Sequence, residues 1–139
     1  MKLITLVFLF SQLAFAYPNH GILGHWEAQN TILGRGVEFN LGFEFTEHRM
    51  NIKVVCHYYD GAHLQSSATS HVSYQGSNIV IRENIENVAN DGFRYCSAAL
   101  RPSVWTTHYD GYGRLVLYSP TPYQAQFVLV RTGDWNLLN

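Results

Sequence analysis

Strict alternation of apolar and polar residues between Val37 and Tyr58 constrains this chain more than any other feature. Apolar side chains stand at every second position of two runs, which a short polar break at 47–49 separates: Val37, Phe39, Leu41, Phe43 and Phe45, then Met50, Ile52, Val54, Cys56 and Tyr58. A period of two sends alternate side chains to opposite faces of a β-strand. The two runs therefore predict an antiparallel hairpin with one buried apolar face.

Turn signals divide the rest of the chain into further short strands. Predicted strands at 24–33, 62–74, 78–84, 93–100, 103–109, 114–119 and 124–132 are separated by turns or loops rich in Gly, Asn, Asp and Pro. Residues 87–92 are predicted to form a polar loop, and Pro102 is expected at an edge, bend or corner because it lacks an N–H. Eight or nine strands in sequential hairpins predict an all-β fold, a single antiparallel up-and-down barrel, with a two-sheet β-sandwich as the alternative.

The turn at Asp60-Gly61 decides which side chains of the following strand face inward. A three-residue turn pairs Tyr58 with Ala62 and sends Leu64 and every second residue after it inward. A two-residue turn pairs Tyr58 with His63 and exchanges the two faces, because a slip of one residue moves every side chain. The first register is preferred, since it buries the apolar set.

The N-terminus and the two cysteines bear on the cellular location. Lys2, an apolar run at 3–10 and Ala14-Phe15-Ala16 have the pattern of a secretory signal peptide, which predicts a leader at 1–16 and a single β-barrel domain at 17–139. In an exported protein Cys56 and Cys96 are expected to form one disulfide, which is worth on the order of 3–4 kcal/mol for a loop of this length. We therefore expect a secreted or periplasmic protein.

Composition and motifs exclude several functions. The formal net charge is −1 and charged residues make up 14% of the chain, so a basic stripe for nucleic acid is absent. No segment after the leader approaches the length of a membrane-spanning helix, so membrane insertion is not expected. A Gly-x-Ser-x-Gly elbow is also missing, and the sequence predicts neither an enzyme nor a cofactor.

Histidines are the candidate metal ligands. His57, His63 and His71 lie around the Asp60-Gly61 turn, but no HxH or HExxH spacing occurs. Zinc needs three or four converging ligands, and the preferred register turns His57 and His63 outward. The sequence thus predicts exposed histidines and no metal site.

Gly24-His25-Trp26 resembles the Gly-x-Trp signature of lipocalins and the wider calycin superfamily. In that family the tryptophan plugs one end of the barrel and an arginine from the last strand lies over it. Arg131 stands in the matching place, so the resemblance implies structural roles for Trp26 and Arg131. Cation–π stacking is a sound physical basis for such a pair.

Two functions follow from a barrel of this kind. The first is a lipocalin-like protein that binds a small, largely apolar molecule in its lumen, lined by Phe39, Phe43, Phe45, Tyr58, Ser66, Ser70 and, at the rim, Trp105. The second is a protein-binding or enzyme-inhibitor module with a filled barrel that acts through loops at 59–62, 87–92 and 110–113. Avidin-like barrels and periplasmic lysozyme or protease inhibitors are also small, exported and eight-stranded. The volume of the lumen discriminates between the two functions.

Overall fold

The computed structural model describes residues 20–29, 32–34, 36–110, 112–120 and 125–133, which form one short helix and eleven strands. These elements, in chain order, are the 3-10 helix η2 (His20–Ile22) and the strands β1 (Gly24–Ala28), β2 (Ile32–Gly34), β3 (Val37–Phe45), β4 (Arg49–Tyr58), β5 (His63–Gln75), β6 (Asn78–Ile81), β7 (Ile85–Asn90), β8 (Tyr95–Leu100), β9 (Ser103–Tyr109), β10 (Leu115–Tyr118) and β11 (Gln126–Thr132). Within these ranges no helix is long and apolar enough to cross a membrane.

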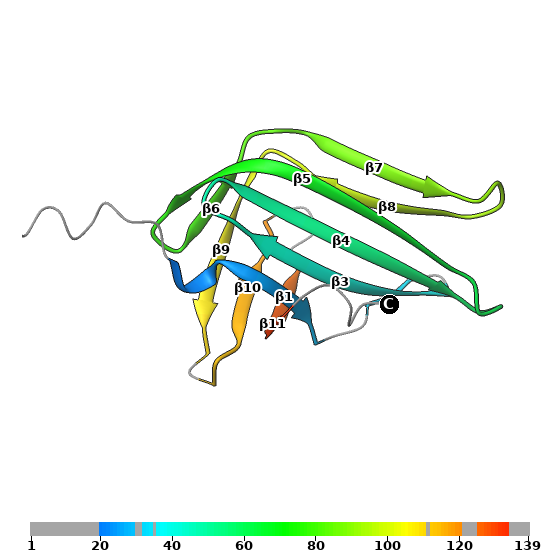
Figure 1. Cartoon of the computed structure of the whole chain (residues 1–139), viewed down its shortest axis with the longest axis horizontal. Helices are drawn as coiled ribbons and strands as arrows, with labels where there is room; N and C mark the ends of the chain where they lie inside the picture. Colours follow the sequence, from blue (N-terminus) through cyan, green and yellow to red (C-terminus); the bar gives the residue numbers. More distant parts are fainter. Residues whose placement is uncertain (1–19, 30–31, 35, 111, 121–124, 134–139) are drawn as a thin grey trace, which may run out of the picture.

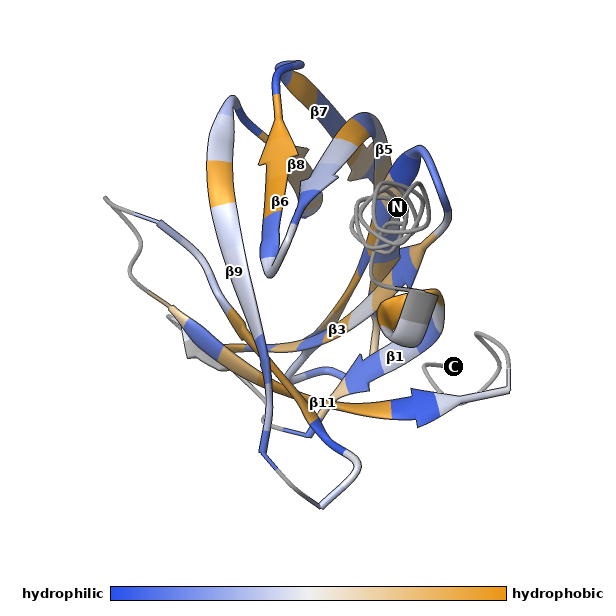
Figure 2. Cartoon of the chain, turned by 90° about the vertical axis from the view of Figure 1, so that its left-hand side faces the viewer, coloured by the Kyte–Doolittle hydropathy of each residue, from blue (hydrophilic) through white to orange (hydrophobic). Residues whose placement is uncertain are grey.

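Eight antiparallel strands close into a barrel, as the sequence predicts. The order is β1-β11-β10-β9-β6-β5-β4-β3, and the pairing of β3 with β1 closes the circle (Figures 1 and 2). The predicted first strand at 24–33 is instead two strands, because β1 pairs with the second half of β3 and β2 with its first half. Closure pairs each of these eight strands with two neighbours.

The register after β4 is the one that the apolar pattern favours. Cys56 pairs with Leu64 and the Tyr58 N–H donates to the Ala62 carbonyl at 2.9 Å, which confirms the three-residue turn. Gly61 makes this turn possible because it takes a φ of +84°. Even-numbered residues of β4 and β5 consequently face inward, and Ala68 and Ser70 are buried.

The segment between β6 and β9 departs from the sequence prediction. Residues 87–92, predicted to be a loop, belong mostly to β7, which pairs with β8 in a separate two-stranded sheet. Figure 1 shows this hairpin lying along the outer part of β5, beyond the barrel, and contacts of β5 with β7 and of β4 with β8 agree. Pro102 lies at the bend where the chain leaves the hairpin for β9, as expected.

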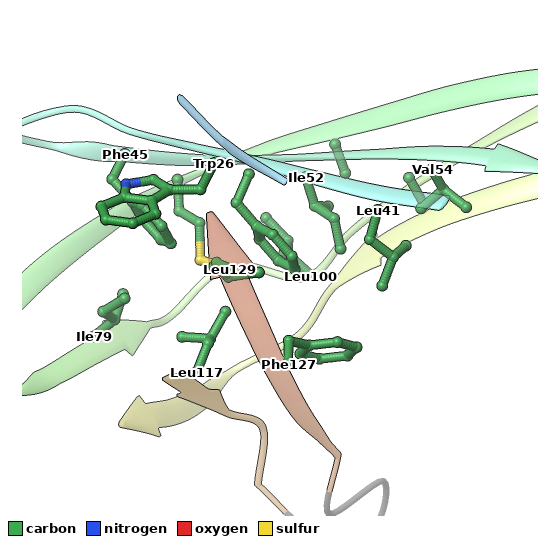
Figure 3. Close-up of a cluster of buried hydrophobic side chains, with 14 of the residues drawn as sticks. Trp26, Leu41, Phe45, Ile52, Val54, Ile79, Leu100, Leu117, Phe127 and Leu129 are labelled. Carbon is green, nitrogen blue, oxygen red and sulfur yellow. The ribbon is translucent and has the colours of Figure 1, made fainter. Parts of the chain in front are cut away.

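Large side chains pack together in the interior of the barrel. Phe43 has no exposed surface, and its ring lies 5.8 Å from that of Phe127 and 6.4 Å from that of Trp105 between centroids. Aliphatic side chains from strands around the barrel complete the cluster in Figure 3, among them Ile52, Ile79, Leu117 and Leu129. Rings at such separations gain packing energy beyond their burial, so this cluster is the main core of the fold.

Trp26 and Arg131 close one end of the barrel. The buried Trp26 indole donates its N–H to the Ile22 carbonyl at 2.7 Å, and the Arg131 guanidinium carbon lies 4.3 Å from the Trp26 ring centroid. The guanidinium also donates to the carbonyls of Leu23 and Gly21, both at 2.6 Å. The stacked pair implied by the Gly-x-Trp resemblance is therefore present, and it fixes η2 across this end.

Candidate functional site

Three hairpin turns meet at the end of β3 and β4 that lies away from Trp26. They are the turns β2–β3 (at Gly36), β4–β5 (59–62) and β7–β8 (91–94). We call this region the hairpin-tip surface and define it by its three most exposed aromatic side chains, Tyr59, Phe93 and Tyr95, which are 92%, 94% and 71% exposed. A surface with so much uncovered aromatic area in one place is typical of a binding site.

Aspartates build the two larger turns locally. Asp60 Oδ1 accepts the Ala62 N–H at 3.1 Å, and Asp91 Oδ1 accepts the N–H groups of Phe93 and Arg94 at 3.0 and 2.8 Å. These bonds replace the backbone partners that a turn leaves unpaired. The pKa values of both carboxyls are lowered, first of all because backbone N–H groups donate to them.

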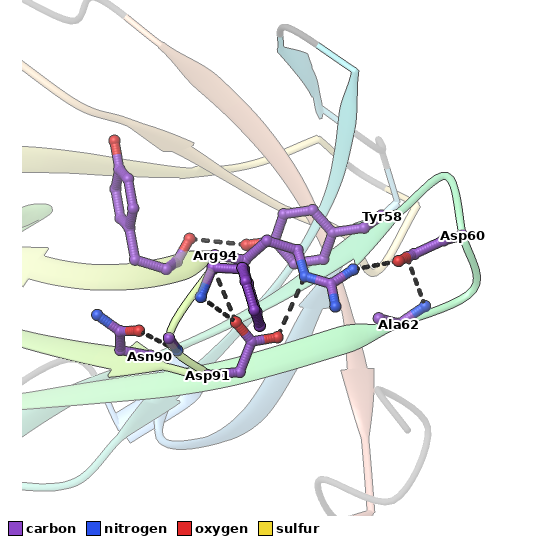
Figure 4. Close-up of polar contacts among 9 residues, drawn as sticks. Tyr58, Asp60, Ala62, Asn90, Asp91 and Arg94 are labelled. Carbon is purple, nitrogen blue, oxygen red and sulfur yellow. Dashed lines mark hydrogen bonds and ion pairs between the residues drawn. The ribbon is translucent and has the colours of Figure 1, made fainter.

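Arg94 joins the two turns. Its guanidinium donates to Asp60 Oδ2 in one turn and, at 3.1 Å, to Asp91 Oδ2 in the other (Figure 4). The hydrogen bond to Asp60 is the main reason that the pKa of Arg94 is raised. The same guanidinium lies 5.1 Å from the centroid of the Tyr58 ring, which gives it an aromatic face as well as two carboxylates.

Tyr58 and the disulfide hold β8 against β4 below this bridge. The Tyr58 hydroxyl donates to the Tyr95 carbonyl at 2.7 Å, and burial is the main cause of its raised pKa. Cys56 and Cys96 form the disulfide that the sequence predicts, with Cα atoms 5.9 Å apart. The two hairpins are thus linked at three successive levels, so the aromatic residues at their tips are carried by a fixed base.

An open apolar pocket of about 600 Å³ lies between β3 and β8 beside the tips. Its lining residues come from the β7–β8 turn and from β2, β3, β4 and β8: Gly34, Val37, Phe39, Tyr58, Phe93, Arg94, Tyr95, Cys96 and Ser97. The volume falls in the range of small-molecule sites, and most of the lining is hydrophobic or aromatic. The pocket and the hairpin-tip surface share Phe93 and Tyr95, so they form one continuous site.

The predicted ligand-binding residues divide between this site and the core. Phe39 and Tyr58 line the pocket, whereas Phe43, Phe45 and Ser70 are buried in the barrel. Ser66 donates its hydroxyl to the Asn87 carbonyl at 2.8 Å, underneath β7. Trp105 packs against Phe43 and Phe127 and donates its indole N–H to Ser103.

The three predicted loops are likewise not all together. Arg94 bridges the turn at 59–62 to Asp91, at the end of the predicted 87–92 loop, whereas the predicted loop at 110–113 follows Tyr109, whose hydroxyl donates to the Gly21 carbonyl at the Trp26 end. Exposed Tyr112 therefore belongs to another part of the surface.

The three histidines considered as metal ligands lie in two separate places. The His57 and His63 rings are neighbours on the outer face, with centroids 6.2 Å apart, and His57 Nε2 lies 3.1 Å from the Asn40 amide. His71 is a residue of the far end of β5 and contacts Glu83 there. Among the residues with described positions, no group of three or more His, Cys, Asp or Glu could hold a metal ion.

Sequence reasoning missed Arg94 as a site residue and included Asp91 only within the predicted loop at 87–92, although a signal for Arg94 exists. Tyr58 follows Cys56 by two positions and Arg94 precedes Cys96 by two, so the period of two places each pair on one strand face. The disulfide then brings Arg94 over Tyr58. Comparisons of the chain with protein-family models, curated proteins and solved structures find no match.

Proposed function

We propose that this chain is an exported, lipocalin-like binding protein that holds a protein partner at its hairpin-tip surface. Support for export comes from the leader pattern at 1–16 together with a disulfide, a bond that persists in oxidising compartments. Support for a lipocalin-like relationship comes from the closed eight-stranded barrel and the Arg131–Trp26 stack at its end.

One observation carries the choice of a protein partner: three exposed aromatic side chains stand on a cross-linked base beside an apolar pocket. Tyr59 and Phe93 extend from turns, and Tyr95 from the start of β8, in two hairpins that Arg94 and the disulfide join. Aromatic residues dominate the energetics of protein interfaces, and a base that is already ordered loses little entropy on binding. Exposed aromatic side chains at hairpin tips are one of the two features expected of a protein-binding module.

A small apolar ligand is the second candidate, and the pocket between β3 and β8 favours it. Phe39 and Tyr58, two of the residues expected to bind such a ligand, line this pocket, and about 600 Å³ is sufficient for one. Because Phe43 and Phe127 pack together in the barrel, such a ligand would sit at the pocket and not in the lumen.

Site-specific photo-cross-linking tests the proposal. A photoreactive phenylalanine analogue replaces Phe93 in one protein and Tyr118, an exposed aromatic residue of β10, in a matched control. Each protein is incubated in the fluid into which it is exported, and a cross-linked polypeptide is identified and purified. We expect a specific cross-link from position 93 alone.

Affinity measured with that purified partner completes the test. Phe93→Ser and Tyr59→Ser should each weaken binding about tenfold or more, as for aromatic residues at the centre of an interface, whereas Tyr118→Ser should not. Equal cross-linking from both positions, or an affinity that depends on Tyr118 and not on Phe93, contradicts the proposal. Saturable binding of a small apolar probe together with no position-specific cross-link favours the second candidate.

A further inference from the structure

We infer, resting on the proposed function, that the partner binds as an extended strand added to the free edge of β8. In the described part of the chain β8 pairs with β7 alone. Its other edge therefore offers main-chain groups to a second chain, and strand addition of this kind is a common mode of peptide recognition.

Hydrogen-bonded and non-hydrogen-bonded residue pairs alternate along the β7–β8 hairpin. This alternation identifies which main-chain groups of β8 point toward its free edge. The Asp91 N–H donates to the Arg94 carbonyl at 3.2 Å, so these two residues are a hydrogen-bonded pair. Pairs alternate along an antiparallel ladder, which makes Ala89 and Cys96 the next such pair. Ser97 lies one position further on, and its N–H and C=O must point away from β7, as must those of Ala99.

Within the described part of the chain, these main-chain groups have no hydrogen-bond partner. Among the hydrogen bonds of the described residues, none involves the backbone N–H or C=O of Ser97 or Ala99 on that side. The next carbonyl in the same row, that of Tyr95, already accepts a hydrogen bond from the Tyr58 hydroxyl. An incoming strand would thus have donors and acceptors available from Ser97 to Ala99 and would meet Tyr58 toward the tip.

The pocket lies beside this edge. Ser97 and Cys96 form one wall, and Val37 and Phe39 of β3 belong to the lining as well. A strand laid along β8 has alternate side chains on opposite faces, so every second one would face β3 and β4 and enter the pocket. The lining selects apolar residues at those positions, since it offers Val37, Phe39 and Tyr58.

The charge of the hairpin tips places a further requirement on the incoming peptide. Among the described residues, Asp60 and Asp91 form ion pairs with the same cation, Arg94, so this group of three carries one net negative charge. Hydrogen bonds that lower the pKa of both carboxyls keep them ionised at neutral pH. The occupant that fits is therefore an extended peptide segment with alternating apolar residues and a Lys or Arg near the tip.

A peptide selected on the intact protein tests this binding mode. Peptides are selected from a random display library, and the tightest is synthesised in versions that carry one N-methylated amide each. Methylation removes a single main-chain donor without changing the side chains. If the peptide is a strand on β8, methylation at alternate residues should lower affinity about tenfold or more, and methylation between them should have little effect.

Proline variants of the protein provide the matched pair. Ser97 and Val88 are directly opposite in the hairpin, and both N–H groups point out of it, toward β8's free edge and β7's outer edge respectively. Ser97→Pro should abolish peptide binding, Val88→Pro should retain it, and thermal unfolding checks that both proteins fold. Amide exchange gives a readout in the wild type, where the peptide should slow exchange at Ser97 and Ala99.

The outcomes separate the strand inference from the proposed function. Binding that depends on Phe93 but tolerates N-methylation at every position overturns strand addition and leaves the hairpin-tip surface as the site. If no peptide binds and no purified partner depends on Phe93, both the strand inference and the proposed function are overturned. Concentration-dependent protection of Ser97 without peptide, with a dimer in light scattering, assigns the edge to a second copy and also overturns the inference. Should Ser97→Pro fail to fold, the N-methylation pattern decides.

Discussion

Gly36 shows at the residue scale how the hairpin-tip surface depends on a single side chain being absent. It has a φ of +80°, and a Cβ added there would lie 2.5 Å from Cε2 of Tyr59. Glycine thus serves two purposes in the β2–β3 turn: it adopts the left-handed conformation, and it leaves space for the Tyr59 ring. An aromatic side chain that is 92% exposed nevertheless has a defined neighbour.

Gly36→Ala is expected to move Tyr59 as well as strain the turn. Gly76→Ala is the matched control, because Gly76 has a φ of +61° with nothing near its missing Cβ. Each substitution should lower the free energy of unfolding by about 1–2 kcal/mol, the cost of a left-handed non-glycine residue. Only Gly36→Ala should shift the ring resonances of Tyr59 in NMR spectra. Unchanged Tyr59 resonances in a folded Gly36→Ala protein would contradict the contact.

At the scale of elements, the β4–β5 and β7–β8 hairpins form one unit. The disulfide, the Tyr58–Tyr95 hydrogen bond and the Arg94 bridge connect them in order from strand to tip. Asp60 and Asp91 contribute only when ionised, because both accept hydrogen bonds from N–H groups and from Arg94. The connection between the hairpins should therefore respond to acid.

We expect the hairpin tips to lose their share of stability in acid. The pKa values of Asp60 and Asp91 are lower in the folded protein than in the unfolded chain, so their stabilisation is complete above the unfolded pKa of about 4 and is lost as the pH falls through the folded values. Melting temperatures measured from pH 6 downward should thus fall more steeply for the wild type than for the Asp60→Asn/Asp91→Asn double variant.

Glu47→Gln, a substitution in the exposed β3–β4 turn, is the control for charge alone. Its melting temperature should follow that of the wild type over the same pH range. Parallel pH profiles for the wild type and the double variant would show that the two aspartates do not stabilise the folded tips.

At the scale of the whole molecule, the barrel follows from the sequence and the hairpin beside it does not. Alternation predicted β3 and β4 within a residue or two, and the Gly61 turn predicted the register of β5. These features are local: one buried face per strand and one residue with a positive φ. Closure followed because sequential antiparallel hairpins leave two edges that can pair.

The strand β7 was missed because a polar residue, Asn87, stands between Ile85 and Ala89 on the face that packs against the core. Asn87 lies on the side toward β5. Its side-chain amide donates to the Ser67 main-chain carbonyl at 2.7 Å, and its main-chain carbonyl accepts a hydrogen bond from the Ser66 hydroxyl. Asn87 interrupts the apolar alternation and its partners are distant in the sequence, so no local pattern predicts this strand. The same contact explains why Ser66, expected to anchor a ligand, is bonded within the protein.

The central claim is that the binding site lies beside the hairpin tips and not in the lumen of the barrel. A chemical-shift titration of the ¹⁵N-labelled protein with indole tests this claim most directly. Indole is a small aromatic probe that can enter either the pocket or an open lumen. The account predicts saturable shifts at Val37, Phe39, Tyr58 and Ser97, around the pocket beside the hairpin tips. Shifts centred instead on Phe43, Phe45 and Leu117, in the core of the barrel, would contradict it.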